Sequence, residues 1–355
     1  MRDIESLASN GRNVISTFSG CGGSSLGYRM AGCQLLAANE FVPAAQEVYK
    51  MNSSASTVML NDDIREMKGD DFLKAVGLDV GELDIFDGSP PCASFSVAGK
   101  RSAEWGQVKK YSDTAQRTDD LFYEYARILK EIQPKAFVAE NVEGLVRGES
   151  KGYFKMIYQE LERCGYNVAA SVLDASRLGV PQARKRLIFI GVRNDLKGTP
   201  RFPQPLPYRF TLADVLRQSD AKIARRNFAG NTISADRPSP TITTTPDEFW
   251  VLDKIINDKE TNANLRQNWG DLQYGKIMRA LLNEPRVKSR TYENTEVEPR
   301  RFNLQELRRI CSFPDDFVLV GSYRQRWERL GRAVPPLMMK AIAQTVCEIL
   351  DETQR

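Results

Sequence analysis

A cysteine that directly follows two prolines is the first candidate for covalent chemistry in this chain. Cys92 comes after Pro90 and Pro91, just beyond residues 83–87, which have the composition of a buried strand. The prolines fix φ and restrict the residue before them, so the backbone that presents the thiol is stiff. At the carboxyl edge of an open α/β sheet, where ligands bind, such a thiol can act as a nucleophile. Many cysteines are simply small buried apolar residues, so a packing role for Cys92 stays open here.

The chain of 355 residues contains no histidine. This absence excludes Ser-His-Asp and Cys-His catalysis, and also the zinc sites that combine cysteine with histidine. If Cys92 is a nucleophile, it must be activated by the substrate itself, by an acid that acts on the substrate, or by local positive charge.

Two further sets of side chains could act on a substrate. Glu140 follows the predicted strand 135–139, where a carboxylate can hold or deliver a proton, although a helix cap or a salt bridge would use the same residue. Arg184 and Arg186 precede another predicted strand, and their alternation would place them on one face. Two guanidinium groups there suit a phosphate or a pyrimidine carbonyl, and a solvated basic turn is the alternative.

A glycine-rich turn follows the first predicted strand, in the pattern Phe18-x-Gly20-x-Gly22-Gly23. Glycines at such a turn let the backbone approach a nucleotide-like group and pack closely at the start of a helix. Glu40 ends the second predicted strand, where it could accept hydrogen bonds from ribose hydroxyls. Asp63 follows the third and could bind an adenine amino group. Together these residues predict a cofactor that contains adenosine.

Strands and helices that alternate along the first half of the chain must position these groups. This rhythm predicts a parallel, doubly wound α/β sheet. The predicted strands cover residues 13–18, 34–39, 58–60, 83–87, 135–139, 168–173 and 187–192, and the predicted helices cover residues 24–30, 43–51 and 120–132.

The rhythm breaks near residue 194, and residues 197–250 are rich in Pro, Thr and Arg without a long periodic segment. We therefore expect a large domain over 1–194 and a smaller, loop-rich domain over 195–300. Helical patterning returns from Asn303 onward. The segment 301–355 is expected to return to the large domain, with a C-terminal helix over 335–350 packed on it.

The composition is typical of a globular protein, with 41% hydrophobic and 27% charged residues. No apolar run reaches the length of a membrane span, and the polar N-terminus is unlike a signal peptide, so a cytoplasmic location is expected. Six scattered cysteines without a Cys-x-x-Cys pair predict free thiols, and no metal site is expected.

The formal net charge is +4, and the excess lies in residues 187–300, which hold 18 Lys and Arg against 14 Asp and Glu. That distribution suits a nucleic-acid surface and, equally, an ordinary solvated face.

The order of these motifs resembles that of the C5-cytosine DNA methyltransferases over almost the whole chain. The matching segments are Phe18-x-Gly20-x-Gly22-Gly23, Pro90-Pro91-Cys92, Glu140-Asn141-Val142, Gln182-x-Arg184-x-Arg186, Arg301-Phe302-Asn303-Leu304-x-Glu306-Leu307 with Phe313-Pro314-Asp315, and Gly331-x-Ala333-Val334. The resemblance implies a Rossmann-like class I fold that uses S-adenosylmethionine, with a smaller target-recognition domain.

The resemblance also implies a mechanism in which Cys92 attacks C6 of cytosine while Glu140 protonates N3. C5 then takes the methyl group from S-adenosylmethionine, and loss of the C5 proton expels Cys92. Arg184 would orient the cytosine, and Arg186 would position the Cys92 loop or the substrate. The cytosine must be flipped out of its duplex for this attack.

Further site residues are implied by the same resemblance. Cofactor contacts would come from Phe18, Gly20, Gly22, Gly23, Glu40, Phe41, Asp63, Ile64, Pro90, Leu121 and Ala333. DNA contacts would come from the loop 93–117, through Ser94, Ser96, Lys100, Arg101 and Lys109, and from Arg237 and Thr243 in the recognition region. The expected partner is duplex DNA, bound by a monomer without membrane or metal, and a cognate restriction endonuclease would act independently.

Two positions depart from the family pattern: Ser16 stands where Asp is more usual, and Arg332 stands where Asn is usual. Both are expected at the cofactor site, where they would alter affinity or activity. Two alternative functions remain: C5 methylation of transfer RNA with the same residues, and a catalytically weakened DNA-binding homologue.

Overall fold

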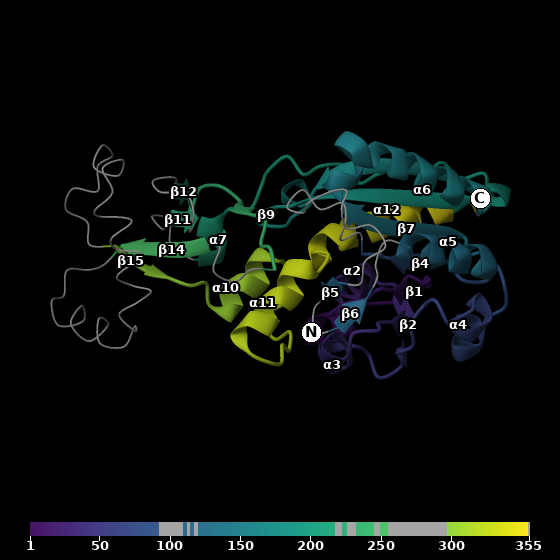
Figure 1. The fold of residues 1–355 in the computed structure, drawn as a ribbon, viewed down its shortest axis with the longest axis horizontal. Helices are drawn as coiled ribbons and strands as arrows, with labels where there is room; N and C mark the ends of the chain where they lie inside the picture. The colour runs from purple at the N-terminus through teal and green to yellow at the C-terminus, as the bar shows by residue number, and fades with distance from the viewer. Residues whose placement is uncertain are drawn as a thin grey trace.

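The computed structural model describes residues 1–91, 109–111, 114–116, 120–216, 222–225, 232–244, 249–254 and 297–353. Within these residues, a seven-stranded sheet forms the centre of the larger part of the molecule (Figure 1). Its strand order is β3-β2-β1-β4-β7-β10-β8. The strands are β1 (Asn13–Thr17), β2 (Gln34–Asn39), β3 (Val58–Leu60), β4 (Ile85–Gly88), β7 (Ala136–Val142), β8 (Tyr166–Asp174) and β10 (Lys185–Arg193).

Helices cover both faces of this sheet, which confirms the predicted doubly wound α/β class. One core lies between the sheet and the helices α4 (Gly69–Val76), α5 (Leu121–Ile132) and α6 (Lys151–Arg163). A second core lies on the other face, under α2 (Gly23–Met30) and α12 (Pro336–Thr353). Neighbouring residues of β1 divide between the two, since Val14 joins one core and Ile15 the other.

The expectation of a parallel sheet is wrong at one strand. β10 runs antiparallel to both of its neighbours, β7 and β8. The connection from β8 to β10 contains only the short η4 (Ala175–Arg177) and β9 (Gln182–Ala183), without a crossover helix. A parallel return needs a dozen or more residues, usually with a helix, so the chain comes back antiparallel.

A smaller antiparallel sheet lies at one end of the molecule, in the order β12-β11-β14-β15 (Figure 1). Its described strands are β11 (Lys222–Arg225), β12 (Thr232–Ser234), β14 (Phe249–Lys254) and β15 (Val297–Arg300). The helices α10 (Leu304–Ile310) and α11 (Tyr323–Arg332) lie between the two sheets (Figure 1). A third core joins them to α7 (Leu212–Leu216), to Val251 of the small sheet, and to Cys21 and Leu26 beside the glycine-rich turn.

The remaining described elements are short or peripheral. They are α1 (Arg2–Glu5), α3 (Pro43–Asn52), β5 (Lys109–Tyr111), β6 (Thr114–Gln116), η2 (Glu143–Val146), η3 (Gly148–Ser150), η5 (Asn194–Leu196) and β13 (Ser239–Pro240). Among the described residues, the stretch Tyr323–Thr353 alone is long and apolar enough to cross a membrane, and 67% of its most apolar window is buried in the fold. Core helices of globular proteins can have the same length and composition, so the packing of α12 on the sheet accounts for its apolar residues.

Candidate active site

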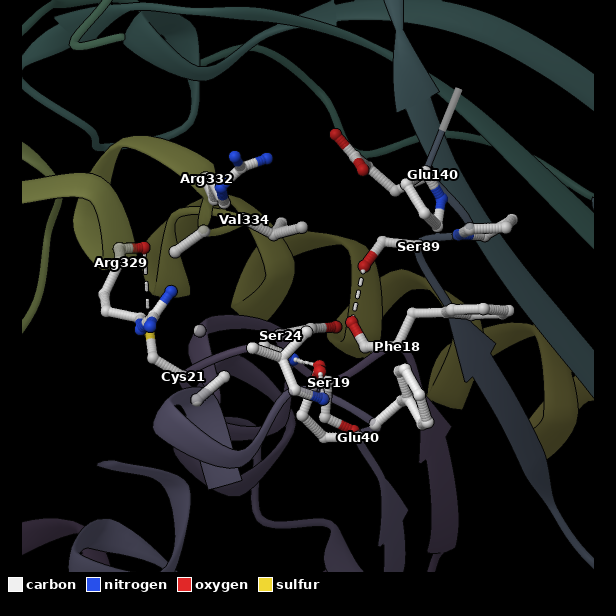
Figure 2. Close-up of a pocket in the computed structure, with 18 of the residues that line it drawn as sticks. Phe18, Ser19, Cys21, Ser24, Glu40, Ser89, Glu140, Arg329, Arg332 and Val334 are labelled. Atoms are coloured by element: carbon white, nitrogen blue, oxygen red, sulfur yellow. Dashed lines mark hydrogen bonds between the residues drawn. The ribbon is translucent and has the colours of Figure 1, made fainter. Parts of the chain in front are cut away.

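A cavity of about 440 Å³ opens at the carboxyl ends of β1, β2, β4 and β7 (Figure 2). Ligands of open α/β sheets bind at this edge, and the volume is that of an ordinary small-molecule site. The structure brings most of the predicted catalytic and cofactor residues into its wall. They are Phe18, Gly20, Gly23, Glu40, Phe41, Asp63, Ile64, Pro90, Leu121, Glu140, Arg184, Arg186 and Ala333.

The glycine-rich turn forms one wall of the cavity. Gly20 has a φ of 56° and Gly22 a φ of 93°, in the left-handed region that favours glycine. Gly22 is outside the cavity wall and is the N-cap of α2. A Cβ on Gly23 would lie 2.2 Å from the carbonyl oxygen of Val334. The turn therefore needs glycine to approach the segment that follows α11.

Glu40 fixes the turn from the end of β2. Its Oε2 accepts a hydrogen bond from the backbone N–H of Gly20 at 2.7 Å, and its Oε1 accepts one from Val42 at 2.7 Å. Burial raises the pKa of Glu40, and the backbone N–H groups oppose this effect. Each carboxylate oxygen keeps a second lone pair, so Glu40 can still accept from a ligand hydroxyl.

Asp63 lies at the cavity in an ion pair with Arg65. Arg65 Nη1 is 2.9 Å from Asp63 Oδ2, and Arg65 Nη2 is 2.8 Å from Asp120 Oδ1. Asp120 is the N-cap of α5, whose first residue Leu121 is part of the cavity wall. This bridge holds the loop after β3 against the start of α5.

The opposite wall carries an ion pair that is largely, but not fully, buried. Arg186 Nε lies 2.7 Å from Glu140 Oε1, and the two side chains are 15% and 12% exposed. Glu140 belongs to β7, which the sequence predicted to end at Ala139, three residues before its observed end at Val142. β7 extends because Asn141 and Val142 pair with β10 after the pairing with β4 stops at Ala139.

Arg184 is almost fully buried beside this pair. Its Nη1 donates to the carbonyl of Ile242 at 3.2 Å, and its Nη2 donates to that of Arg332 at 3.3 Å. Nε has no hydrogen-bond partner among the described residues. Burial, and secondarily the charge of Arg186, lower the pKa of Arg184 to about 9, so it stays cationic at neutral pH. The sequence predicted that Arg184 and Arg186 lie on one face of a strand. Arg184 instead precedes β10, but both arginines line the same cavity.

The backbone that leads to Cys92 is held by hydrogen bonds to the residue after β1 and to β7. Ser89 Oγ donates to the carbonyl of Phe18 at 3.2 Å, and Asn141 Nδ2 donates to that of Pro90 at 3.3 Å. Pro91, the residue directly before Cys92, is part of the cavity wall. Predicted residues that lie outside the described part of the chain are Cys92, Ser94, Ser96, Lys100 and Arg101, together with the side chain of Lys109.

The two predicted DNA contacts beyond residue 200 are described. Arg237 is exposed in the turn after β12, and its carbonyl accepts a hydrogen bond from Leu212. The carbonyl of Thr243 accepts a hydrogen bond from Trp327 Nε1 at 2.8 Å. Thr244, the next residue, is part of the cavity wall, so this segment lies at the edge of the site.

The two departures from the family pattern have different surroundings. Arg332 is part of the cavity wall, and its Nε forms an ion pair with Glu328 Oε1 at 2.9 Å. Ser16 is absent from the cavity wall and donates instead to buried Asp87 at 2.7 Å. Sequence reasoning missed Asp87 and Ser24, although a serine directly after the glycine pair is a signal that could have been used.

The wall chemistry fits an adenosine-containing cofactor. Gly20 lines the cavity and has no atom within 4 Å of its Cβ position, and the carboxylates of Glu40 and Asp63 can accept from hydroxyl and amino groups. Phe18, Ile64 and Leu121 supply apolar surface nearby. In the described part of the chain, no cluster of side chains is suited to hold a metal ion.

Comparison with known proteins connects this geometry to a family. Residues 12–348 match the family model of the C-5 cytosine-specific DNA methylases. The chain is 32% identical to Type II methyltransferase M1.HphI of Haemophilus parahaemolyticus over 94% of this chain and 86% of the relative. It is 30% identical to M.FnuDI of Fusobacterium nucleatum over 96% of each chain.

The solved structure of a Spodoptera frugiperda DNMT2 variant shares the fold, with a TM-score of 0.65 and 18% identity over 95% of this chain and 99% of that chain. These matches confirm the resemblance to the C5-cytosine DNA methyltransferases that the sequence motifs indicated. The chain belongs to the family of C-5 cytosine-specific DNA methylases, and it is a DNA cytosine methyltransferase that takes its methyl group from S-adenosylmethionine.

Proposed function

We propose that the enzyme methylates a flipped-out cytosine through a covalent bond between Cys92 and C6 of the base. The observation that carries this proposal is the convergence of Glu140, Arg184 and Pro91 on the cavity that also contains the glycine-rich turn. Pro91 directly precedes Cys92, so a nucleophile and an acid would approach one base from two neighbouring strand ends.

The chain's own groups divide the steps between them. The Cys92 thiolate forms a bond to C6. Glu140, protonated from solvent, delivers its proton to N3 and becomes a carboxylate, so that negative charge does not build up on the ring. Arg186 holds the Glu140 carboxylate at 2.7 Å, and Arg184, which also lines the cavity, would orient the base. S-adenosylmethionine supplies the methyl group to C5. A water molecule then takes the C5 proton, and the electron pair of that bond forms the C5–C6 double bond and expels the Cys92 thiolate. N3 returns its proton to Glu140.

Residues 195–300 would form the domain that recognises the DNA sequence, with 1–194 as the catalytic domain and 301–355 as the returning segment. The separate four-stranded sheet and the basic excess of residues 187–300 support this division. Positive charge on such a surface would contact phosphates and leave base edges to side chains such as Arg237. The enzyme would act as a cytoplasmic monomer in a restriction–modification system, beside an endonuclease that binds DNA independently.

Trapping of the covalent intermediate tests the mechanism. The enzyme and S-adenosylmethionine are incubated with duplex DNA that contains 5-fluorocytosine, and the products are separated on a denaturing gel. Fluorine at C5 cannot leave as a proton, so we expect a covalent protein–DNA adduct that Cys92→Ala abolishes.

Cys164→Ala provides a matched control, since this buried thiol lies in the α5–α6 core and burial raises its pKa to about 11. It should leave the adduct intact. A parallel incubation with 5-fluorocytosine-substituted transfer RNA separates the two substrates. An adduct with transfer RNA alone, or one that survives Cys92→Ala, would contradict the proposal.

A further inference from the structure

A buried carboxylate lies beneath the cavity and takes no part in the proposed chemistry. Asp87, in β4, is 2% exposed. Its Oδ2 accepts hydrogen bonds from Ser16 Oγ at 2.7 Å and from Ser24 Oγ at 2.7 Å, and its Oδ1 accepts one from Tyr28 at 3.3 Å. Burying a charge is costly unless it is hydrogen-bonded, so three donors on one side chain indicate a built network.

The ionisation of Asp87 fixes the direction of these bonds. Burial raises its pKa to about 6, against the opposing effect of the hydroxyl groups, so the side chain is a carboxylate at neutral pH. An ionised carboxylate can only accept. All three hydroxyl groups must therefore donate to it, and a fully satisfied buried network specifies one arrangement of its members.

This network reaches the cavity through the glycine-rich turn. Ser24 and Ser19 are both cavity-lining residues in Figure 2. Ser24 is the second residue of α2. The N-cap of that helix is Gly22, which has no side chain that could cap the helix. The bond from Ser24 to Asp87 thus anchors the first turn of α2 to β4. Ser19 Oγ donates to the carbonyl of Ser16 at 2.9 Å, which anchors the other end of the turn.

Ser16 and Asp87 are direct neighbours across the sheet. The parallel register of β1 and β4 pairs Ser16 with Asp87 and Thr17 with Gly88. Position 16 is where the family pattern more often has Asp. In this chain, the carboxylate stands instead on the adjacent strand, at the matching position of the register.

We infer that Asp87 is a positioning residue for the cofactor: it holds Ser24 and the glycine-rich turn in their binding geometry, and it provides from β4 the carboxylate that position 16 lacks. This inference rests on the proposed assignment of the cavity to S-adenosylmethionine.

Exchange of the two residues tests this inference. Binding of S-adenosylmethionine is measured by calorimetry for the wild type, Asp87→Ser, Ser16→Asp and the exchanged double variant, along with melting temperature, kcat and KM. Asp87→Ser should weaken binding about tenfold, the value of one hydrogen bond to a charged group. Its kcat at saturating cofactor should stay within about twofold, because Asp87 does not touch the reacting atoms.

Ser16→Asp alone should also weaken binding, since it places two carboxylates side by side. The double variant Ser16→Asp/Asp87→Ser should bind within about threefold of the wild type, because the carboxylate returns to the network from β1. Ser25→Ala is the matched control: this buried serine bonds to Tyr49 and lies outside the cavity wall, so binding should not change.

Three outcomes overturn the inference: wild-type affinity in Asp87→Ser, a double variant that binds no better than Asp87→Ser, or a fall in kcat without a change in KM. If Asp87→Ser fails to fold, recovery of folding and binding in the double variant supports the inference, and its failure to recover overturns it. A wild type that does not bind S-adenosylmethionine would contradict the assignment of the cavity instead.

Discussion

At the residue scale, the cavity is organised by charged side chains that the protein itself holds in place. Glu40 accepts from backbone N–H groups, Glu140 pairs with Arg186, and Arg184 donates to two carbonyl groups. Groups that are already oriented need no rearrangement when charge develops on a bound base.

Sequence reasoning identified these residue types but not their pairing. Glu140 and Arg186 are far apart in the chain, and they meet because β10 lies antiparallel beside β7, with Ile188 opposite Glu140. Predicting that contact requires the strand order and direction, which residue types do not encode. Asp87 was missed for the same reason, because its partners come from β1 and α2.

The ion pair between Glu140 and Arg186 leads to a prediction on stability. Arg186→Ala leaves a mostly buried carboxylate without its partner, so the free energy of unfolding should fall by about 3 kcal/mol. Urea denaturation at constant neutral pH measures this change. The double variant Arg186→Ala/Glu140→Gln should recover part of the loss, because no unpaired charge remains. If the stability changes of Arg186→Ala and Glu140→Gln simply add up in the double variant, this account is contradicted.

At the element scale, each predicted strand of the large sheet is present in the structure, and so are the predicted helices at 24–30, 43–51 and 120–132, because buried strands and amphipathic helices have strong local patterns. The helices α4 and α6 were not predicted. β2 (Gln34–Asn39) has the predicted bounds, and α5 starts one residue later than predicted. The direction of β10 could not be predicted in this way. It depends on a connection whose short elements, η4 and β9, carry no periodic signal.

The packing of α2 against α12 was also beyond the local pattern. Gly27 occurs one helical turn after Gly23, and both face the C-terminal segment. A Cβ on Gly27 would lie 2.5 Å from Met339 Cβ and 2.6 Å from the carbonyl oxygen of Pro336. The backbone of α12 can approach α2 this closely because neither glycine has a side chain.

Substitution of these helical glycines gives the prediction at this scale. Gly27→Ala should lower the free energy of unfolding by about 2 kcal/mol, since the new methyl group forces α12 away from α2. Gly152→Ala in α6 is the matched control, because nothing lies within 4 Å of its Cβ position. Alanine there should raise stability by about 0.5–1 kcal/mol through its better helix propensity. Thermal denaturation of both variants checks the pair, and equal effects would contradict the packing argument.

At the scale of the whole molecule, both ends of the chain contribute to one structure. The core beneath α2 contains Val14 from the first strand and Leu350 from the last helix. Arg12 adds a polar link, since its Nη1 is 3.4 Å from Asp84 and its Nη2 is 2.5 Å from Asp351. The helical pattern of residues 335–350 predicted a terminal helix, and the structure shows which residues of the sheet and of α2 this helix packs against.

Removal of the last helix is therefore expected to prevent folding, even though every strand of the seven-stranded sheet precedes residue 194. A chain that ends at Val334 lacks Met338, Met339, Ile342 and Val346, which are fully buried, and would expose one face of the sheet to water. We expect this truncation to lose protease resistance and binding of S-adenosylmethionine together. A chain that ends at Thr353 keeps all of α12 and should retain both.

Because the contacts of α12 join residues more than 300 positions apart, such as Cys33 and Cys347, the native core cannot close until the C-terminus is available. A truncated chain that still binds the cofactor would show that the sheet is stable without this cover.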